Sequence, residues 1–263
     1  MPLFGLGPIA AGRGYRVLGY ETVGSTMTEA ANAARSGDAG DLWVAALEQT
    51  AGRGRRGRQW QTIPGNLAAS LLVEPGSDPA VTATLGFVAG VALHRALLET
   101  VERAIAATLR LKWPNDVLAG DAKLAGILLE ATPLSGGRQG VIVGIGVNVV
   151  AAPEGLPYPA TALATLGSRV TAPVLFSALA ENWCLAFETW NRGRGLQALL
   201  ADWRPRAFGL GGPVRIERET GMIAGTFESV DDEGRLVLRA VDGGRTAISA
   251  GDVHFGTARS VRS

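Results

Sequence analysis

The sequence predicts an α+β protein with two domains, a mixed-sheet domain over residues 1–208 and a small all-β domain over residues 209–263. Helical and strand-like apolar patterns alternate as far as Trp203, whereas short alternating strands separated by Gly and Asp turns follow Pro205. The length of 263 residues and a hydrophobic content of 47% are ample for a core. We place the hinge at the Gly-rich segment 209–213.

The strands of the first domain are expected where apolar residues run continuously or alternate, over 15–23, 42–47, 67–73, 109–113, 117–119, 124–131 and 141–150. Helices are expected over 26–35, 81–101, 173–190 and 196–203. The first helix begins with a capping-box pattern, Thr26-Met27-Thr28-Glu29, and stops at Gly37. A polar loop, 49–62, lies between two core strands, and tight turns follow at Pro114-Asn115-Asp116 and Gly120-Asp121.

The second domain is expected to contain four short strands, over 214–219, 222–230, 235–240 and 245–249. Their short, even spacing is typical of a small barrel.

The charge balance excludes binding of nucleic acid or anionic lipid through net charge, because 25 basic residues face 24 acidic ones. Cys184 is the only cysteine, so no internal disulfide and no Cys-rich zinc site can form. We expect Cys184 to be a buried helix residue, and we expect His94 to be either a packed or a half-exposed helix residue. With two histidines in the chain, a histidine-built metal centre is not expected.

Neither of the most apolar stretches is long enough to span a membrane, because His94-Arg95 and Asn148 interrupt them. The N-terminus has no basic region followed by a cleavage site, so a cytoplasmic location is expected.

Two motifs contain unusual cations. Gly52-Arg53-Gly54-Arg55-Arg56-Gly57-Arg58, followed by Trp60, combines glycines that let a ligand approach with guanidiniums that bind oxyanions. This pattern suits a phosphate-bearing small ligand, while RNA binding and a solvated basic loop remain alternatives.

The second motif carries the only two lysines, against 23 arginines: Lys112-Trp113-Pro114-Asn115-Asp116 and, eleven residues on, Lys123-Leu124-Ala125-Gly126. A lysine kept in so Arg-rich a chain indicates a need for a compact ammonium. Gly144-Ile145-Gly146-Val147-Asn148 is a weaker signal, since a strand bulge would explain its glycines equally well.

These motifs, in this order and spacing, resemble those of the biotin protein ligases, and the resemblance runs from Gly24 to about Asn148. It implies a fold similar to class II aminoacyl-tRNA synthetases with an SH3-like C-terminal barrel. It also implies formation of biotinyl-5′-adenylate from biotin and ATP, with Mg²⁺ accompanying the nucleotide, and transfer of biotin to a lysine of a biotin carboxyl carrier domain. Dimerisation is common in such ligases. Only 14 residues precede the first strand, so no N-terminal DNA-binding domain is expected here.

The resemblance also assigns residues. The catalytic set is Arg53, Arg55, Asp116 and Lys123; the biotin-binding set is Ser25, Thr26, Gln49, Gly52, Arg53, Gly54, Arg55, Lys123 and Gly126; the nucleotide-binding set is Arg56, Arg58, Trp60, Asn115 and Asn148. Asp116 would orient either Lys123 or the incoming lysine amine, and Trp60 would cover the adenine unless it is a core residue. Met27 and Ala122 depart from the residues usual at their positions.

Two other functions are compatible with parts of the pattern. A lipoate or octanoyl transferase of the same fold also has a lysine-centred acyl site. The segment 52–60, called the Arg loop from here on, and the C-terminal barrel disfavour this alternative. A non-enzymatic RNA-binding module would use the Arg loop and leave the lysine motifs unexplained.

Overall fold

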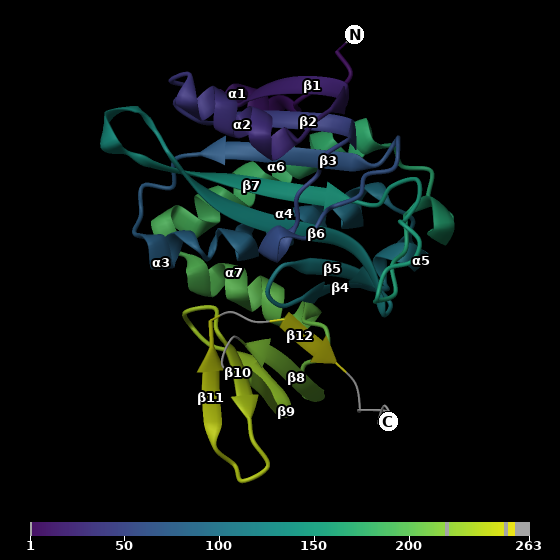
Figure 1. Ribbon diagram of the computed structural model, residues 1–263, viewed down its shortest axis with the longest axis vertical. Coiled ribbons are helices and arrows are strands. Elements are labelled where there is room, and N and C mark those ends of the chain that lie inside the picture. Colours follow the sequence, from purple (N-terminus) through teal and green to yellow (C-terminus); the bar gives the residue numbers. More distant parts are fainter. Residues whose placement is uncertain (1, 219–220, 250–251, 256–263) are drawn as a thin grey trace.

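The computed structural model describes residues 2–218, 221–249 and 252–255. A seven-stranded sheet of order β1-β2-β3-β7-β6-β5-β4 forms the larger part (Figure 1). Its strands are β1 (Arg16–Val23), β2 (Leu42–Gln49), β3 (Leu67–Val73), β4 (Leu109–Lys112), β5 (Asp116–Ala119), β6 (Ala122–Pro133) and β7 (Gln139–Val147). β1 and β2 are parallel because a helix connects them, and the other neighbours are antiparallel. The predicted mixed sheet with flanking helices is confirmed.

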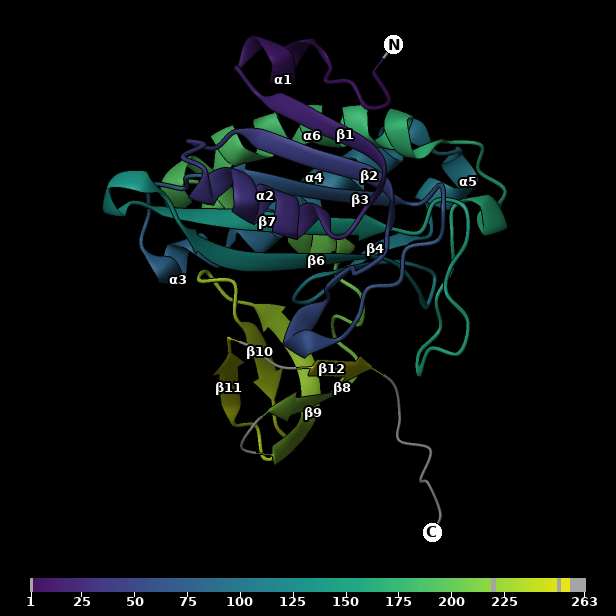
Figure 2. The same cartoon turned by 45° about the horizontal axis from the view of Figure 1, so that its top comes forward.

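Helices cover both faces of this sheet (Figure 2). They are α1 (Pro8–Gly12), α2 (Thr26–Arg35), α3 (Pro79–Thr82), α4 (Leu85–Thr100), α5 (Arg103–Ala106), α6 (Ala172–Trp190) and α7 (Leu196–Trp203). α4 and α6 pack against each other over one face, and α2 packs against β2, β3 and β7 on the other.

The C-terminal part is a five-stranded antiparallel sheet of order β11-β10-β9-β8-β12. Its strands are β8 (Pro213–Arg218), β9 (Gly221–Val230), β10 (Leu236–Arg239), β11 (Arg245–Ile248) and β12 (Asp252–Phe255). The sequence predicts only four of these strands, since β12 is too short to show alternation. The expected end of the first strand at Glu219 lies outside the described residues.

Three local expectations are wrong. The helix expected over 81–101 is broken into α3 and α4, and the Asp78 side chain caps α3 by accepting hydrogen bonds from the N–H groups of Ala80 and Val81. The capping box at Thr26 does not form; Ser25 is the N-cap and makes no side-chain cap hydrogen bond. The strand expected over 141–150 ends at Val147.

The region Pro79–Thr100 is apolar and long enough to cross a membrane by composition, but 67% of its most apolar window is buried inside the protein. It contains α4, whose residues from Leu85 to Leu97 are almost all buried against α6 and the sheet. This burial is typical of a core helix. Cys184 is buried as expected, and His94 is packed, at 1% and 4% exposure.

Candidate functional site

The Arg loop folds over the α2 face of the sheet and is held there by polar contacts. Arg53 forms an ion pair with Glu130 of β6, with 3.0 Å between Nη2 and Oε2. Arg55 Nη1 donates a hydrogen bond of 3.0 Å to Oδ1 of Asn115. The loop also closes on itself, since the Trp60 N–H donates to the Gly52 carbonyl at 3.0 Å. Two of its arginines therefore have protein partners on the sheet and in the Asn115 turn.

Trp60 lies on a floor of glycines. A Cβ added to Gly146 would come within 2.4 Å of the indole, and one added to Gly126 within 3.1 Å. Gly126 and Gly146 face each other across β6 and β7. Neither β7 pairing shows a register shift, so a bulge does not explain the glycines of this motif. They leave room for Trp60 and, at Gly144, for the Met27 sulfur, which would lie 2.7 Å from an added Cβ.

The Lys123 ammonium lies beside one carboxylate and two aromatic rings. Its Nζ lies 2.8 Å from Oδ1 of Asp116, and both side chains are less than one-fifth exposed. The contact is an ion pair without hydrogen-bond geometry, because this Oδ1 has no hydrogen-bond partner among the described residues. Nζ also lies 5.6 Å from the Trp60 ring centroid and 5.5 Å from that of Tyr158.

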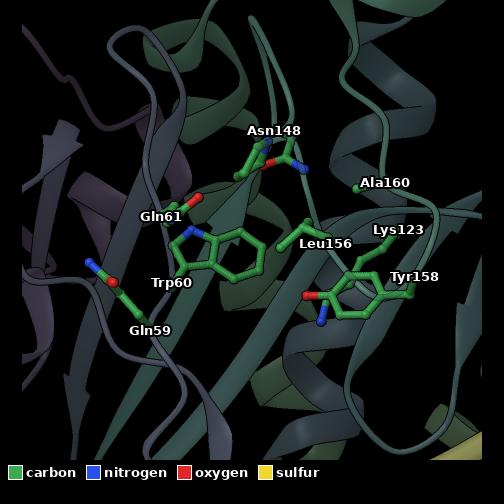
Figure 3. A pocket seen from close by; sticks show the side chains of 9 residues that line it. Gln59, Trp60, Gln61, Lys123, Asn148, Leu156, Tyr158 and Ala160 are labelled. Atoms are coloured by element: carbon green, nitrogen blue, oxygen red, sulfur yellow. The ribbon is translucent and has the colours of Figure 1, made fainter.

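These side chains line a cavity of about 100 Å³ (Figure 3). Its lining residues are Gln59, Trp60, Gln61, Lys123, Asn148, Pro153, Leu156, Tyr158 and Ala160. Sites for small ligands usually measure roughly 300–1,000 Å³. A larger ligand therefore needs a displacement of the loop or of the segment that carries Tyr158.

Asn148 follows β7 at the wall of the cavity. Its Nδ2 donates to the Thr161 carbonyl at 3.1 Å, whereas its Oδ1 is buried and has no hydrogen-bond partner among the described residues. A buried acceptor without a partner is costly unless a ligand supplies a donor. Asn148 is therefore suited to bind a polar group in the cavity.

A second polar group lies on the same face, around the start of α2. Gln49 Oε1 accepts hydrogen bonds from the N–H and the Oγ1 of Thr26, at 2.8 and 3.0 Å. Thr26 Oγ1 is also 2.8 Å from Ser70 Oγ. The buried Oγ of Ser25 has no partner among the described residues, which leaves a donor and acceptor for a ligand.

Gly52 connects the two groups. A Cβ at this position would come within 2.3 Å of the Trp60 carbonyl oxygen and 2.9 Å of Gln49 Nε2. The polar group at α2 and the cationic group at Lys123 therefore adjoin along one face of the sheet.

Most sequence-predicted site residues come together in these contacts. The exceptions are Gly54, Arg56 and Arg58, which take no part in the contacts described above; Arg56 and Arg58 are exposed on the loop. Met27 is buried in an apolar cluster with Val44 and Ile142, so that position contributes packing.

Sequence reasoning missed three residues of the site: Ser70, Glu130 and Tyr158. Ser70 is the only polar residue in the buried strand Leu67–Val73, which is a signal that could have found it. Glu130 ends the apolar run that begins after Lys123, but only the fold shows that it meets Arg53. Tyr158 approaches Lys123 because the Lys123 N–H donates to the Pro159 carbonyl at 2.8 Å, a long-range pairing that local sequence does not reveal.

Among the described residues, no group of three or more His, Cys, Asp or Glu side chains could hold a metal ion.

Comparisons with known proteins give a consistent result. Residues 19–148 match the biotin/lipoate A/B protein ligase family, and residues 209–256 match the biotin protein ligase C-terminal domain. A biotin–[acetyl-CoA-carboxylase] ligase of Paracoccus denitrificans is 39% identical over 241 residues, which cover 88% of this chain and 97% of that protein.

Solved structures agree with this result. The biotin protein ligase of Aquifex aeolicus in complex with biotin and ATP matches with a TM-score of 0.78 and 25% identity over 92% of this chain and 99% of that one. The biotin protein ligase of Leishmania major in complex with biotinyl-5-AMP matches with a TM-score of 0.60 and 27% identity over 89% and 99%.

Proposed function

The chain belongs to the biotin/lipoate A/B protein ligase family and is an enzyme of the biotin–[acetyl-CoA-carboxylase] ligase type, and we propose that it works in two steps. It joins biotin and ATP into biotinyl-5′-adenylate, and it then transfers the biotinyl group to one lysine of a biotin carboxyl carrier domain. The observation that carries the proposal is the position of the Lys123 ammonium. It lies 2.8 Å from Asp116, next to the turn where Asn115 accepts a hydrogen bond from Arg55.

In the first step a carboxylate oxygen of biotin attacks the α-phosphorus of ATP, and pyrophosphate leaves. The two reacting groups repel each other because both are anionic. The positive charges of Lys123, Arg53 and Arg55 lower this repulsion. Their effect is stronger in the transition state, where negative charge accumulates, than in the ground state. Asp116, Glu130 and Asn115 hold these cations on the same face of the sheet, so positive charge is gathered there before the substrates bind.

The polar group at α2 would bind the ureido ring of biotin. That ring offers two N–H donors and a carbonyl acceptor, and Ser25, Thr26 and Gln49 supply both kinds of partner. The nucleotide would lie toward Trp60 and Asn148, where the indole offers a flat surface and the free Oδ1 accepts a hydrogen bond.

In the second step the acceptor lysine amine attacks the acyl carbon of the adenylate, AMP leaves, and the nitrogen loses a proton. An acyl phosphate anhydride hydrolyses readily, so the site must exclude water between the steps. The Arg loop covers the floor of the site and is suited to this role. The contact of Asp116 with Lys123 favours the role of orienting Lys123 over that of orienting the acceptor amine.

We extend the proposal to the finer expectations from the sequence. The Mg²⁺ that accompanies ATP would enter with the phosphates, which supply oxygen ligands for it. The domains divide at 208/209, the larger one has a class II synthetase-like fold, the C-terminal sheet is an SH3-like barrel, and the enzyme acts in the cytoplasm.

The partner surface that we propose is the edge strand β1. The sheet ends in β1 and β4, and residues Ala207 and Phe208 already pair with β4 at Leu111. The outer side of β1 is left for pairing with a carrier domain or with a second copy of this chain.

The test is a transfer assay with ATP, Mg²⁺, a carrier domain and either labelled biotin, lipoate or octanoate. We expect label from biotin on one carrier lysine, with loss of transfer when that lysine is replaced by arginine. Transfer of lipoate or octanoate without transfer of biotin would instead identify the chain as a lipoate or octanoyl transferase of the same fold.

A further inference from the structure

The C-terminal sheet holds the strand that precedes the Asn115–Asp116 turn. The Trp113 Nε1–H donates a buried hydrogen bond of 3.0 Å to the Gly234 carbonyl, in the β9–β10 turn. Two residues earlier, the Leu111 carbonyl accepts a hydrogen bond of 2.8 Å from the Phe208 N–H. The end of β4 is therefore held at Trp113 by the C-terminal sheet and at Leu111 by the segment that leads to that sheet.

Gly234 fits a position that no other residue could occupy without strain. Its φ of +83° lies in the left-handed region, and an added Cβ would come within 2.5 Å of the Phe87 ring. Phe87 belongs to α4 and packs edge-on against Trp203, with 5.4 Å between ring centroids. The Gly234 carbonyl is therefore aimed at Trp113 by a close fit against the core of the larger domain.

The larger domain also holds the β9–β10 turn. Arg204 donates hydrogen bonds to the carbonyls of Val230 and Asp231, at 2.9 and 3.2 Å, and to Oδ1 of Asp232 at 3.0 Å. These contacts bind the turn at residues 230–232, and the Trp113 contact binds it at Gly234, so the turn is held at two places.

Two residues that follow Trp113, Asn115 and Asp116, contact the cations of the site. Asn115 Nδ2 donates to the Ile127 carbonyl at 2.6 Å, and Asn115 Oδ1 accepts from Arg55. Asp116 forms the ion pair with Lys123. A shift of Trp113 would thus move the partners of both catalytic cations, and a misplacement of about 1 Å can lower a rate by roughly a hundredfold.

We propose that Trp113 and Gly234 are positioning residues, through which the C-terminal sheet fixes the turn that holds Lys123 and Arg55. The inference rests on the proposed function of that turn. It gives the C-terminal sheet a part in adenylate formation that is distinct from binding the carrier domain.

The first experiment compares Trp113→Phe with Trp190→Phe. Trp190 is a matched control, because its indole N–H also makes a buried hydrogen bond, of 2.7 Å to Thr84 Oγ1, outside the site. We expect Trp113→Phe to lower kcat for biotinyl-adenylate formation by about tenfold, with the Kd for biotin changed by less than about twofold. Trp190→Phe should leave kcat within about twofold at a temperature where both variants are folded. An equal effect of the two substitutions on kcat would overturn the inference.

The second experiment removes the hydrogen bonds that Arg204 donates to the β9–β10 turn. Arg204→Gln should lower kcat in the same way, and the double variant with Trp113→Phe should lose little more than Trp113→Phe alone. Multiplication of the two effects in the double variant would contradict the coupling. Arg95→Gln is the control, since Arg95 pairs with Asp202 at 2.8 Å and does not contact the turn.

Hydrogen exchange separates this inference from the proposed function. Residues 113–117 should exchange faster in Arg204→Gln than in wild type or Arg95→Gln, whatever substrate the enzyme uses. If wild type fails to make the adenylate while this exchange increases, the proposed function fails and the coupling stands. If the adenylate is made and exchange at 113–117 is unchanged in Arg204→Gln, the coupling is wrong.

Discussion

Lys123 obtains its surroundings from three segments: the neighbouring strand β5 with Asp116 and, more distant in sequence, the Arg loop with Trp60 and the segment with Tyr158. The sequence could predict the lysine and Asp116, because their residue types and spacing carry the chemistry. It could not predict Tyr158, since that contact depends on the pairing of residues 159–161 beside Lys123. Nor could the sequence decide whether Asp116 orients Lys123 or the acceptor lysine amine. The 2.8 Å contact favours Lys123.

Lys123→Arg should lower the rate of adenylate formation by about a hundredfold while the fold persists. A guanidinium is wider than an ammonium, and the space between Asp116 and the two rings is narrow. The measurement is the single-turnover rate, together with the thermal midpoint. Arg138→Lys at the surface ion pair with Glu74 is the control for an Arg/Lys exchange. A near-normal rate in Lys123→Arg would mean that Lys123 is only a strand residue.

His94 should make the protein less stable in weak acid. Burial, followed by the charge of Arg206, lowers its pKa from 6.5 to about 4. The unfolded chain therefore binds a proton below pH 6.5 that the folded chain does not, and stability is lost as the pH falls from 6.5 toward 4.

Urea unfolding at pH 7 and pH 5 tests this effect. Wild type should lose about 2 kcal/mol more than His94→Gln between these pH values, since one pKa unit corresponds to about 1.36 kcal/mol. Equal losses in the two proteins would show that other groups control the acid sensitivity.

At the scale of elements, apolar periodicity predicts the strands and long helices to within a few residues. It does not show the break between α3 and α4, because the apolar pattern continues through residues 83–84 while the backbone turns. β12 is missed for the opposite reason, since four residues give too little pattern. Gly144 and Gly146 of β7 look like a bulge in sequence, and only the packed Met27 and Trp60 explain them.

Gly146→Ala should raise the KM for ATP, because the added methyl would lie 2.4 Å from the Trp60 ring and push it from its place. β7 pairs with β3 and β6 on its two sides and cannot move aside. Overpacking of this kind costs about 1–3 kcal/mol. Gly12→Ala is the control, since nothing lies within 4 Å of its added Cβ. An unchanged KM in Gly146→Ala would place the nucleotide away from Trp60.

The Arg loop should lose protection from hydrogen exchange in Glu130→Gln. Sequence reasoning identifies no partner other than an anion for a loop of glycines and like charges, yet Glu130 and Asn115 supply two. We expect residues 52–60 to exchange faster in Glu130→Gln and to regain protection when biotin and ATP are added. Glu74→Gln, which breaks an ion pair elsewhere, should not affect the loop. Equal exchange in both variants would show that the ion pair does not hold the loop.

At the scale of the whole molecule, the structure identifies the sheet edges, which a single sequence cannot do. β4 is covered by the chain that leads to the C-terminal sheet, and among the described residues the backbone of β1 pairs within the sheet only with β2. Leu18 on β1 is 45% exposed. The net charge of +1 gives a carrier domain little long-range attraction, so backbone pairing and shape must dominate its recognition.

If the carrier domain and a second enzyme copy both use β1, each excludes the other. Sedimentation velocity of the adenylate-loaded enzyme should then show complexes of one enzyme with one carrier, and dimers only in the absence of carrier. Leu18→Lys should weaken both associations, because a lysine at an edge strand opposes pairing. Val174→Lys, at a residue of α6 that is 54% exposed, should weaken neither. A particle of two enzymes with a carrier bound to each would show that the two partners use separate surfaces.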